Sequence, residues 1–298
     1  MPPAKPKTRR TAPGRTDARP AINRRPRKAE HDLPEPAESR LFVTALARGL
    51  DVLSAFRMGD GPLGNQELAH RSGLPKPTVS RMAHTLTQLG YLTYDPRAET
   101  YELGGRTLSL GYAAISNLDI RRVARPIMQD MAERCSVHLA LTIRERLMIL
   151  AVETCEGKSL VGLRLNPGAR MPIALTAGGK AYLATIPKAE RDDILDQVRR
   201  QHGDEWPRIR RSVEQGAREM ENQGFCLSLG EWQSDINGAG AAIVLPNGSG
   251  VYALALGGPA YLMGHERLQL EYGPMLAQAA RRIEQELGAD RACPAVQS

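Results

Sequence analysis

The chain has 298 residues, of which 42% are hydrophobic and 4% aromatic, and a formal net charge of +7. This length predicts about two domains, and this composition indicates globular domains with aliphatic cores. No apolar run reaches the roughly 18 residues of a membrane span, so we expect no transmembrane helix. No apolar run follows the first charges, so we expect no secretory signal. The four cysteines form no CxxC pair and have no histidine at zinc-site spacing. We therefore expect reduced thiols in a cytoplasmic protein, with no metal or other cofactor.

The positive charge is concentrated at the start of the chain. Residues 1–28 contain ten Lys or Arg residues and one acid, Asp17, which gives +9 and leaves −2 for the remainder. Residues 1–39 are Pro-rich and nearly free of large apolar side chains, so we expect a disordered basic tail. Such a tail adds nonspecific affinity for DNA through phosphate contacts. Because the remainder is nearly neutral, net charge alone does not establish nucleic-acid binding.

Residues 40–105 are predicted to form three helices and a β-hairpin. Asn65 is expected to cap the second helix, Pro77 suits the first turn of the third, and Gly90 is its predicted C-terminal cap. The predicted elements are helices at about 41–57, 65–72 and 77–89 and strands at Tyr91–Tyr94 and Thr100–Leu103. This order predicts a winged helix-turn-helix domain.

The first turn of the third helix carries cationic and hydroxyl side chains, although helix starts usually favour acids. In a helix-turn-helix this end enters the major groove, where exposed N–H groups and cations favour phosphate. We therefore predict DNA contacts from that helix and from the hairpin tip. The predicted residues are Lys76, Pro77, Thr78, Ser80, Arg81, His84 and Thr85, with Arg97 at the tip. The alternative is a helix pair with a solvated polar face.

Residues 106–121 predict a linker helix, and the pattern changes after it. Helices and strands then alternate in a way that predicts an α+β domain with a mostly antiparallel sheet over residues 122–288, before a tail at 289–298. The predicted strands are Val137–Ile143, Leu147–Val152, Leu160–Leu165, Phe225–Leu229, Ala239–Leu245 and Val251–Leu256, and the later helices are 177–186, 188–200, 208–222 and Leu268–Leu287.

Several segments carry a resemblance to a known family. They are Ala45–Leu53, Glu67–Ala69, Ser72–Arg81, Tyr101–Gly104, the Thr-Ala-x-Gly-Lys-Ala pattern at Thr176–Ala181, Gly240–Ile243, Gly250–Val251 and Gly258–Pro259. In this order they resemble the IclR family of bacterial transcription regulators. The likeness extends over about residues 41–288.

The resemblance implies a fold and a mode of action. It implies a winged helix joined by the linker helix to a GAF-like effector domain, in dimers or tetramers that bind palindromic double-stranded DNA operators. It also implies a small-molecule effector held near the Thr-Ala-x-Gly-Lys-Ala turn and the last strands. By position, the implied effector-binding residues are Ala177, Gly178, Ser228, Gly238, Ala255 and Gly257.

These positions offer few side-chain donors. We therefore expect an organic or aromatic acid held by backbone N–H groups and apolar contacts. The alternative is that the small residues only let strands and helix pack closely. Two further residues have two interpretations each: His138 is a pocket residue or a core or surface histidine, and Cys226 is a pocket residue or a small buried hydrophobe.

The prediction from sequence is thus a ligand-responsive transcription regulator without catalytic residues. One alternative is a metabolite-processing enzyme with an appended DNA-binding domain, although no nucleophile–base pair supports it. Another is a nonspecific DNA-binding protein driven by the basic tail. The choices between dimer and tetramer and between repressor and activator stay open.

Overall fold

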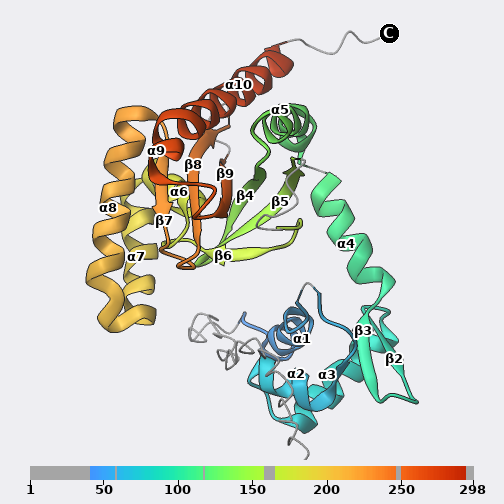
Figure 1. The fold of residues 1–298 in the computed structure, drawn as a ribbon. Helices are drawn as coiled ribbons and strands as arrows, with labels where there is room; N and C mark the ends of the chain where they lie inside the picture. The colour runs from blue at the N-terminus through green and yellow to red at the C-terminus, as the bar shows by residue number, and fades with distance from the viewer. Residues whose placement is uncertain (1–40, 58, 117, 158–164, 246–249, 293–298) are drawn as a thin grey trace, which may run out of the picture.

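The computed structural model describes residues 41–57, 59–116, 118–157, 165–245 and 250–292. Within them the chain forms a small N-terminal domain and a larger C-terminal domain with helix α4 (Gly105–Ser116) between them (Figure 1). The predicted tail at 1–39 lies outside the described residues, as does the predicted strand Leu160–Leu165 except its last residue. Of the tail predicted at 289–298, residues 293–298 also lie outside them, whereas residues 289–292 are helical.

The N-terminal domain contains three helices and a three-stranded antiparallel sheet in the order β1-β3-β2. Its elements are α1 (Thr44–Ser54), β1 (Leu63–Gly64), α2 (Asn65–Ser72), α3 (Lys76–Gln88), β2 (Leu92–Asp95) and β3 (Thr100–Leu103). Apolar side chains at helical spacing on α3, Val79, Ala83 and Leu86, are buried against Val52 and Leu68. Full burial of a Val or Leu side chain stabilises the fold by about 1.5–3 kcal/mol.

Two glycines shape this domain as the sequence predicts. Gly73 ends α2 with φ of 69° and Gly90 follows α3 with φ of 77°, a backbone region that favours glycine. Past Gly90, the N–H of Tyr91 donates to the carbonyl of Leu86 at 2.9 Å, which closes α3 with a Schellman motif. The prediction for Asn65 is wrong, because Gly64 is the N-cap of α2 and Asn65 is the first helical residue.

The predicted linker helix is shorter than expected. α4 ends at Ser116, and the next helix, α5 (Asp119–Cys135), begins after Leu118, whose φ of −91° and ψ of 85° are not helical. Asp119 then lies in the first turn of α5, where a carboxylate is favoured by the helix dipole. The sequence predicted a change of pattern after residue 121, whereas the break between the two helices lies before Asp119.

The C-terminal domain is built on a six-stranded antiparallel sheet in the order β6-β5-β4-β9-β8-β7. Its strands are β4 (His138–Glu145), β5 (Met148–Glu156), β6 (Arg170–Pro172), β7 (Cys226–Leu229), β8 (Ile236–Val244) and β9 (Val251–Pro259). Its later helices are α6 (Ala177–Thr185), α7 (Lys188–His202), η1 (Gly203–Glu205), α8 (Trp206–Gln223), α9 (His265–Arg267), the π-helical turn η3 (Leu268–Tyr272) and α10 (Gly273–Ala292).

Helices cover both faces of this sheet. α5 and α10 pack on one face, and α6, α7 and α8 lie on the other (Figure 1). Each face has its own core of buried apolar residues, one around Leu139 and Leu254 and the other around Ile173 and Leu183. The predicted α+β class, with a winged helix-turn-helix domain before a mostly antiparallel sheet, is confirmed.

Strand ends differ from the prediction where glycine occurs. β8 begins at Ile236, not at Ala239, because Gly238 is paired with Gly257 of β9 in the ladder. Glycine is depleted in strands, so it is a weak strand signal in sequence. Here a Cβ on Gly238 would lie 2.6 Å from the carbonyl oxygen of Leu256, so close packing requires the glycine.

Candidate functional site

The predicted DNA-facing side chains lie on the surface of the N-terminal domain. The exposed ones are Lys76, Pro77, Ser80, Arg81, His84, Thr85 and Arg97, and Thr78 is half-buried. The structure therefore places the start of α3 outside the core with its cationic side chains accessible, as contact with a polyanion requires.

Hydrogen bonds fix the orientation of this end of α3. The Nδ2 group of Asn65 donates to Oγ of Ser80 at 2.9 Å, and this contact joins the starts of α2 and α3. Ser80 keeps its own hydroxyl proton for donation. Thr85 donates its hydroxyl proton to the carbonyl of Arg81 at 3.0 Å, so its oxygen can accept from a partner. Sequence reasoning missed this role of Asn65, because the contact spans 15 residues.

The hairpin tip has a defined turn. Oδ1 of Asp95 accepts from the backbone N–H of Arg97 at 2.8 Å, and Glu99 adopts a positive φ of 53°. The rings of Tyr94 and Tyr101 pack with centroids 4.8 Å apart on paired strands. These contacts hold Arg97 at the tip of the hairpin that β2 and β3 form.

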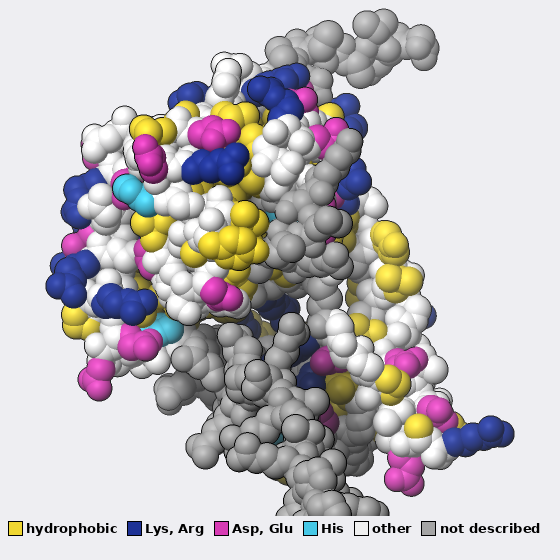
Figure 2. Space-filling view, viewed as in Figure 1, with side chains coloured by type: hydrophobic (Ala, Val, Ile, Leu, Met, Phe, Trp, Pro, Cys, Tyr) yellow, Lys and Arg dark blue, Asp and Glu magenta, His cyan; other side chains and the backbone are white. Residues whose placement is uncertain are grey.

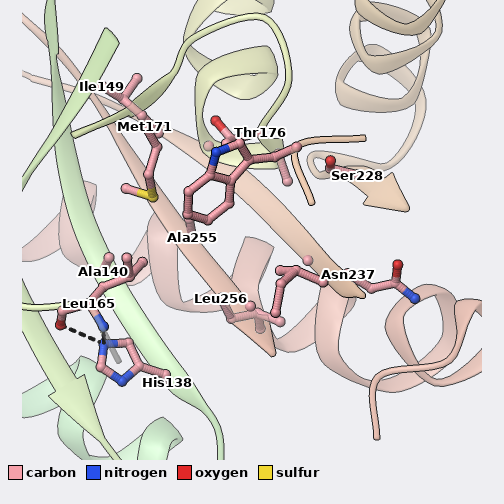
Figure 3. A pocket seen from close by; sticks show the side chains of 16 residues that line it. His138, Ala140, Ile149, Leu165, Met171, Thr176, Ser228, Asn237, Ala255 and Leu256 are labelled. Atoms are coloured by element: carbon pink, nitrogen blue, oxygen red, sulfur yellow. Dashed lines mark hydrogen bonds between the residues drawn. The ribbon is translucent and has the colours of Figure 1, made fainter. Parts of the chain in front are cut away.

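A second site lies in the C-terminal domain, between the sheet and the start of α6 (Figure 3). It is a cavity of about 520 Å³ when the open space at its mouth is included. All six predicted effector-binding residues line it: Ala177, Gly178, Ser228, Gly238, Ala255 and Gly257. The other lining residues are His138, Ala140, Ile149, Leu165, Met171, Thr176, Trp232, Ile236, Asn237 and Leu256.

The lining is mainly apolar, and its polar side chains are largely engaged with backbone. Oγ1 of Thr176 donates to the carbonyl of Pro172 at 2.9 Å, and Oγ of Ser228 donates to the carbonyl of Leu175 at 2.9 Å. Nδ2 of Asn237 donates to the carbonyl of Met263 at 2.8 Å. No Lys, Arg, Asp or Glu is among the described residues that line the cavity.

The N-terminus of α6 borders the cavity. Thr176 is its N-cap, and its Oγ1 accepts from the N–H of Gly179 at 3.3 Å. The N–H groups of Ala177 and Gly178, in the first turn, have no partner within the helix. A Cβ on Gly178 would lie 3.1 Å from Cβ of Ala255, so the glycine keeps space open between α6 and β9.

The glycine residues nearby divide between the two interpretations that the sequence allows. A Cβ on Gly240 would lie 2.3 Å from the carbonyl oxygen of Ala177, and one on Gly179 would lie 1.9 Å from that of Ile173. These two glycines serve close packing of α6 on its neighbours. Gly178 and Gly257 line the cavity, and Gly238 fits both interpretations, because it lines the cavity and a Cβ there would lie 2.6 Å from the carbonyl oxygen of Leu256.

His138 and Trp232 also line the cavity, although neither is among the predicted effector-binding residues. His138 and Leu165 lie at the opposite end from Thr176 and Ser228 (Figure 3). Nε2 of His138 lies 2.9 Å from the carbonyl oxygen of Leu165, and Nδ1 lies 3.7 Å from Oε1 of Glu156. Burial lowers the pKa of His138, against the opposing effects of these two neighbours.

Cys226 does not line the cavity. Its side chain is fully buried, and Sγ donates to the carbonyl of Ala177 at 3.3 Å. Burial raises the pKa of this thiol to about 12, so it stays protonated. The interpretation of Cys226 as a small buried hydrophobe therefore fits the structure.

Both domains match models of one known family. A family model described as the IclR helix-turn-helix domain matches residues 45–96, and a model described as the bacterial transcriptional regulator IclR C-terminal domain matches residues 112–285. The chain belongs to the IclR family. The predicted resemblance is confirmed, and the protein is a transcription regulator with a DNA-binding helix-turn-helix domain and a C-terminal effector-binding domain.

Curated IclR-type relatives match along most of the chain. It is 35% identical over 252 residues to the HTH-type transcriptional regulator TsaQ1/TsaQ2 of Comamonas testosteroni, which covers 84% of this chain and 90% of that protein. It is 25% identical over 254 residues to the Pca regulon regulatory protein of Pseudomonas putida, covering 83% and 84% of the two chains. Both relatives are named as regulators of transcription rather than as enzymes.

Solved IclR structures have the same fold. An IclR family transcriptional regulator from Brucella abortus has a TM-score of 0.75 and 40% identity, covering 84% of this chain and 94% of that one. An IclR homolog from Microbacterium hydrocarbonoxydans, complexed with 4-hydroxybenzoate, has a TM-score of 0.64 and 23% identity, covering 82% and 99%. This second likeness concerns the fold alone.

Two kinds of feature are absent from the described residues. No group of three or more His, Cys, Asp or Glu side chains there could hold a metal ion. Among the same residues, no helix combines the length and the apolar character that crossing a membrane requires.

Proposed function

We propose that this IclR-type regulator binds a palindromic operator as a dimer or tetramer and responds to a small organic acid, in particular an aromatic one, in the cavity beside α6. The main support for this proposal is the cavity, which combines an apolar lining with the N-terminus of a helix. An apolar pocket with few converging polar groups is typical of a small-molecule site.

The chemistry of the cavity favours an anion with an apolar body. The unpaired N–H groups and dipole at the N-terminus of α6 favour a carboxylate at Ala177 and Gly178. Ile149, Met171 and Leu256 offer apolar contact to the rest of the ligand. The six residues predicted to bind the effector remain our proposed contacts, and His138 and Trp232 join them.

The proposed DNA contacts are the eight residues predicted from α3 and the hairpin tip. Their exposure supports the proposal, because Lys76, Arg81 and Arg97 can each reach phosphates or bases from an unhindered surface. The Asn65–Ser80 hydrogen bond supports a fixed orientation of α3.

Exposed apolar side chains support self-association through α1 and α4. Leu46 and Leu50 of α1 are 61% and 53% exposed, and Leu108 and Tyr112 of α4 are 62% and 63% exposed. Hydrophobic side chains are visible on the surface over α4 (Figure 2). Apolar surface of this kind marks an interaction site, and a dimer would present two α3 helices to two operator half-sites.

Regulation would follow from ligand affinity that differs between two arrangements of the DNA-binding domains. We propose a division into the DNA-binding domain at 40–105, the linker at 106–121 and the effector domain at 122–288. In this proposal the protein acts by binding alone, with no catalytic residue and no cofactor, and it acts where the operator DNA is, in the cytoplasm.

Ligand and DNA binding can be tested together. DNA fragments that flank the protein's own gene would be labelled and titrated with full-length protein, with and without 4-hydroxybenzoate, benzoate and aliphatic acids. We expect one fragment to bind in preference to the others, and an aromatic acid to shift its affinity and raise the melting temperature. No preferred fragment, or conversion of an acid into a product, would overturn the proposal.

A further inference from the structure

A buried lysine lies close to the proposed effector cavity without being part of its lining. Lys180 of α6, the lysine of the Thr-Ala-x-Gly-Lys-Ala pattern, is only 2% exposed. Its Nζ lies 2.8 Å from Oε1 of Glu231 and 3.0 Å from Oγ of Ser212. Ser212 also donates to the other oxygen of Glu231. A buried ammonium group is costly without such partners, so the three side chains depend on one another.

The helices make room for this lysine. Gly216 of α8 faces its stem, and a Cβ at Gly216 would lie 3.2 Å from Cβ and 3.3 Å from Cδ of Lys180. α6, α8 and β7 lie side by side at this point (Figure 1). Lys180 thus passes between two helices to reach Glu231, which follows β7.

Glu231 belongs to the connection between β7 and β8, and the next residue, Trp232, lines the cavity. The connection is held by backbone hydrogen bonds at both ends. The N–H of Gly230 donates to the carbonyl of Ile236 at 3.0 Å, and the N–H of Ala260 donates to that of Asp235 at 2.8 Å. Between these two hydrogen bonds, the side chain of Glu231 attaches the connection to Lys180 and Ser212, immediately before Trp232.

Trp232 differs in kind from the rest of the lining. Among the described lining residues only Trp232 and His138 carry rings, and the others are small, aliphatic or hydroxyl side chains, methionine or asparagine. An indole offers a large flat face on which a planar ring can stack or pack edge to face. An aliphatic ring of similar size would be stabilised only by the burial of its apolar surface.

We propose that Trp232 determines the selectivity of the cavity for planar aromatic acids, and that Lys180, Ser212 and Glu231 are its positioning residues. This inference rests on the proposed function, because it concerns the same cavity. Loss of the lysine leaves the Glu231 carboxylate without its cation, which releases the connection and with it the indole face.

Selectivity is measured with benzoate and cyclohexanecarboxylate, which match in size but differ in planarity. The ratio of their dissociation constants is determined by calorimetry for the full-length protein. In Trp232→Leu we expect benzoate affinity to fall about threefold to tenfold more than cyclohexanecarboxylate affinity. Lys180→Met should raise the ratio of the benzoate to the cyclohexanecarboxylate dissociation constant by a similar factor, and Ser212→Ala should raise it by a smaller one. Lys188→Met, at an exposed lysine paired with Asp192, is the matched control and should leave the ratio unchanged.

Fluorescence gives a second measurement. The chain has two tryptophans, so Trp206→Phe leaves Trp232 as the only one. In that background we expect benzoate to change the emission with the midpoint seen by calorimetry, and Lys180→Met or Ser212→Ala to shift the emission of the free protein toward longer wavelength. If Lys180→Met fails to fold, Ser212→Ala provides both measurements.

The outcomes separate this inference from the proposed function. If wild-type protein binds both acids and the variants weaken both equally, the residues have only a structural role and the inference is overturned. An unchanged ratio in Trp232→Leu also overturns it, while the proposed function stands. If neither acid binds wild-type protein, the proposed ligand class fails and the inference fails with it.

Discussion

The carboxylate of Glu153 on β5 accepts hydrogen bonds from Nη2 of Arg121 at 2.7 Å and from Nε of Arg121 at 3.0 Å. The Glu153 side chain is only 3% exposed, and Nη1 of Arg125 lies 2.7 Å from its other oxygen. Both arginines lie on α5, the first helix after α4. The contacts of the two arginines with Glu153 therefore hold α5 against the sheet that lines the cavity.

Removing Arg121 should destabilise the effector domain. In Arg121→Gln one oxygen of the buried Glu153 loses its two hydrogen bonds from Arg121, and the partners that the other oxygen keeps include the N–H of Thr154 and the 61% exposed side chain of Arg125. We therefore expect a loss of about 1–3 kcal/mol in the free energy of unfolding. Urea unfolding followed by circular dichroism measures this loss. Arg134→Gln on the same helix removes an exposed pair with Asp130 and should cost less than about 0.5 kcal/mol. Equal losses in the two variants would contradict the role of the buried contact.

Gly178 should control the room available to the effector. A methyl group there would lie 3.1 Å from Cβ of Ala255 and 3.3 Å from Cδ1 of Ile149. We expect Gly178→Ala to weaken binding of an aromatic acid about tenfold or more, because the added carbon occupies the cavity. Calorimetric titration measures this change. Gly264→Ala, which adds its methyl to open space in the same domain, should leave affinity unchanged.

The sequence predicted elements whose signals are local. The face of Val79, Ala83 and Leu86 has helical spacing, and Gly90 is a local stop signal, so α3 and its end could be predicted. The six cavity residues came from the family resemblance, and the structure brings them together. Their role in binding remains a prediction.

Contacts between distant residues could not be predicted in this way. Lys180 and Glu231 are 51 residues apart, so no spacing rule joins them, and Trp232 enters the cavity only because the connection after β7 folds back. The predicted strand Ala239–Leu245 left out Gly238, because the pairing of Gly238 with Gly257 is a tertiary contact that the sequence does not show. In each case packing between elements overrode the local pattern.

Arg81 should contribute to operator recognition more than to fold. It is exposed on α3, so Arg81→Ala removes a proposed DNA contact without opening the core. We expect operator affinity to fall by about 1–3 kcal/mol, with little change in melting temperature. Fluorescence anisotropy with a labelled operator measures this. Arg210→Ala, at an exposed arginine of α8, is the control and should bind as wild type.

The basic segment at the start of the chain should affect salt dependence rather than sequence preference. Its ten cations predict nonspecific phosphate contacts, so deletion of residues 1–39 should make the plot of log affinity against log salt concentration shallower. Preference for the operator over unrelated DNA should survive. Loss of all preference on deletion would instead support the nonspecific DNA-binding alternative.

Stability should fall in mild acid because of His138. Burial lowers the pKa of His138 below its ordinary value of 6.5, so the unfolded chain takes up a proton at a higher pH than the native protein does. Stability from this residue is therefore fully present above about pH 6.5 and is lost as the pH falls toward the native pKa, with a slope of at most about 1.4 kcal/mol per pH unit. Urea unfolding of wild type and His138→Gln between pH 8 and pH 5 tests this. The variant should lose less stability on acidification, whereas His265→Gln, at an exposed histidine of the same domain, should follow wild type. Parallel curves for wild type and His138→Gln would show that His138 does not carry the acid sensitivity.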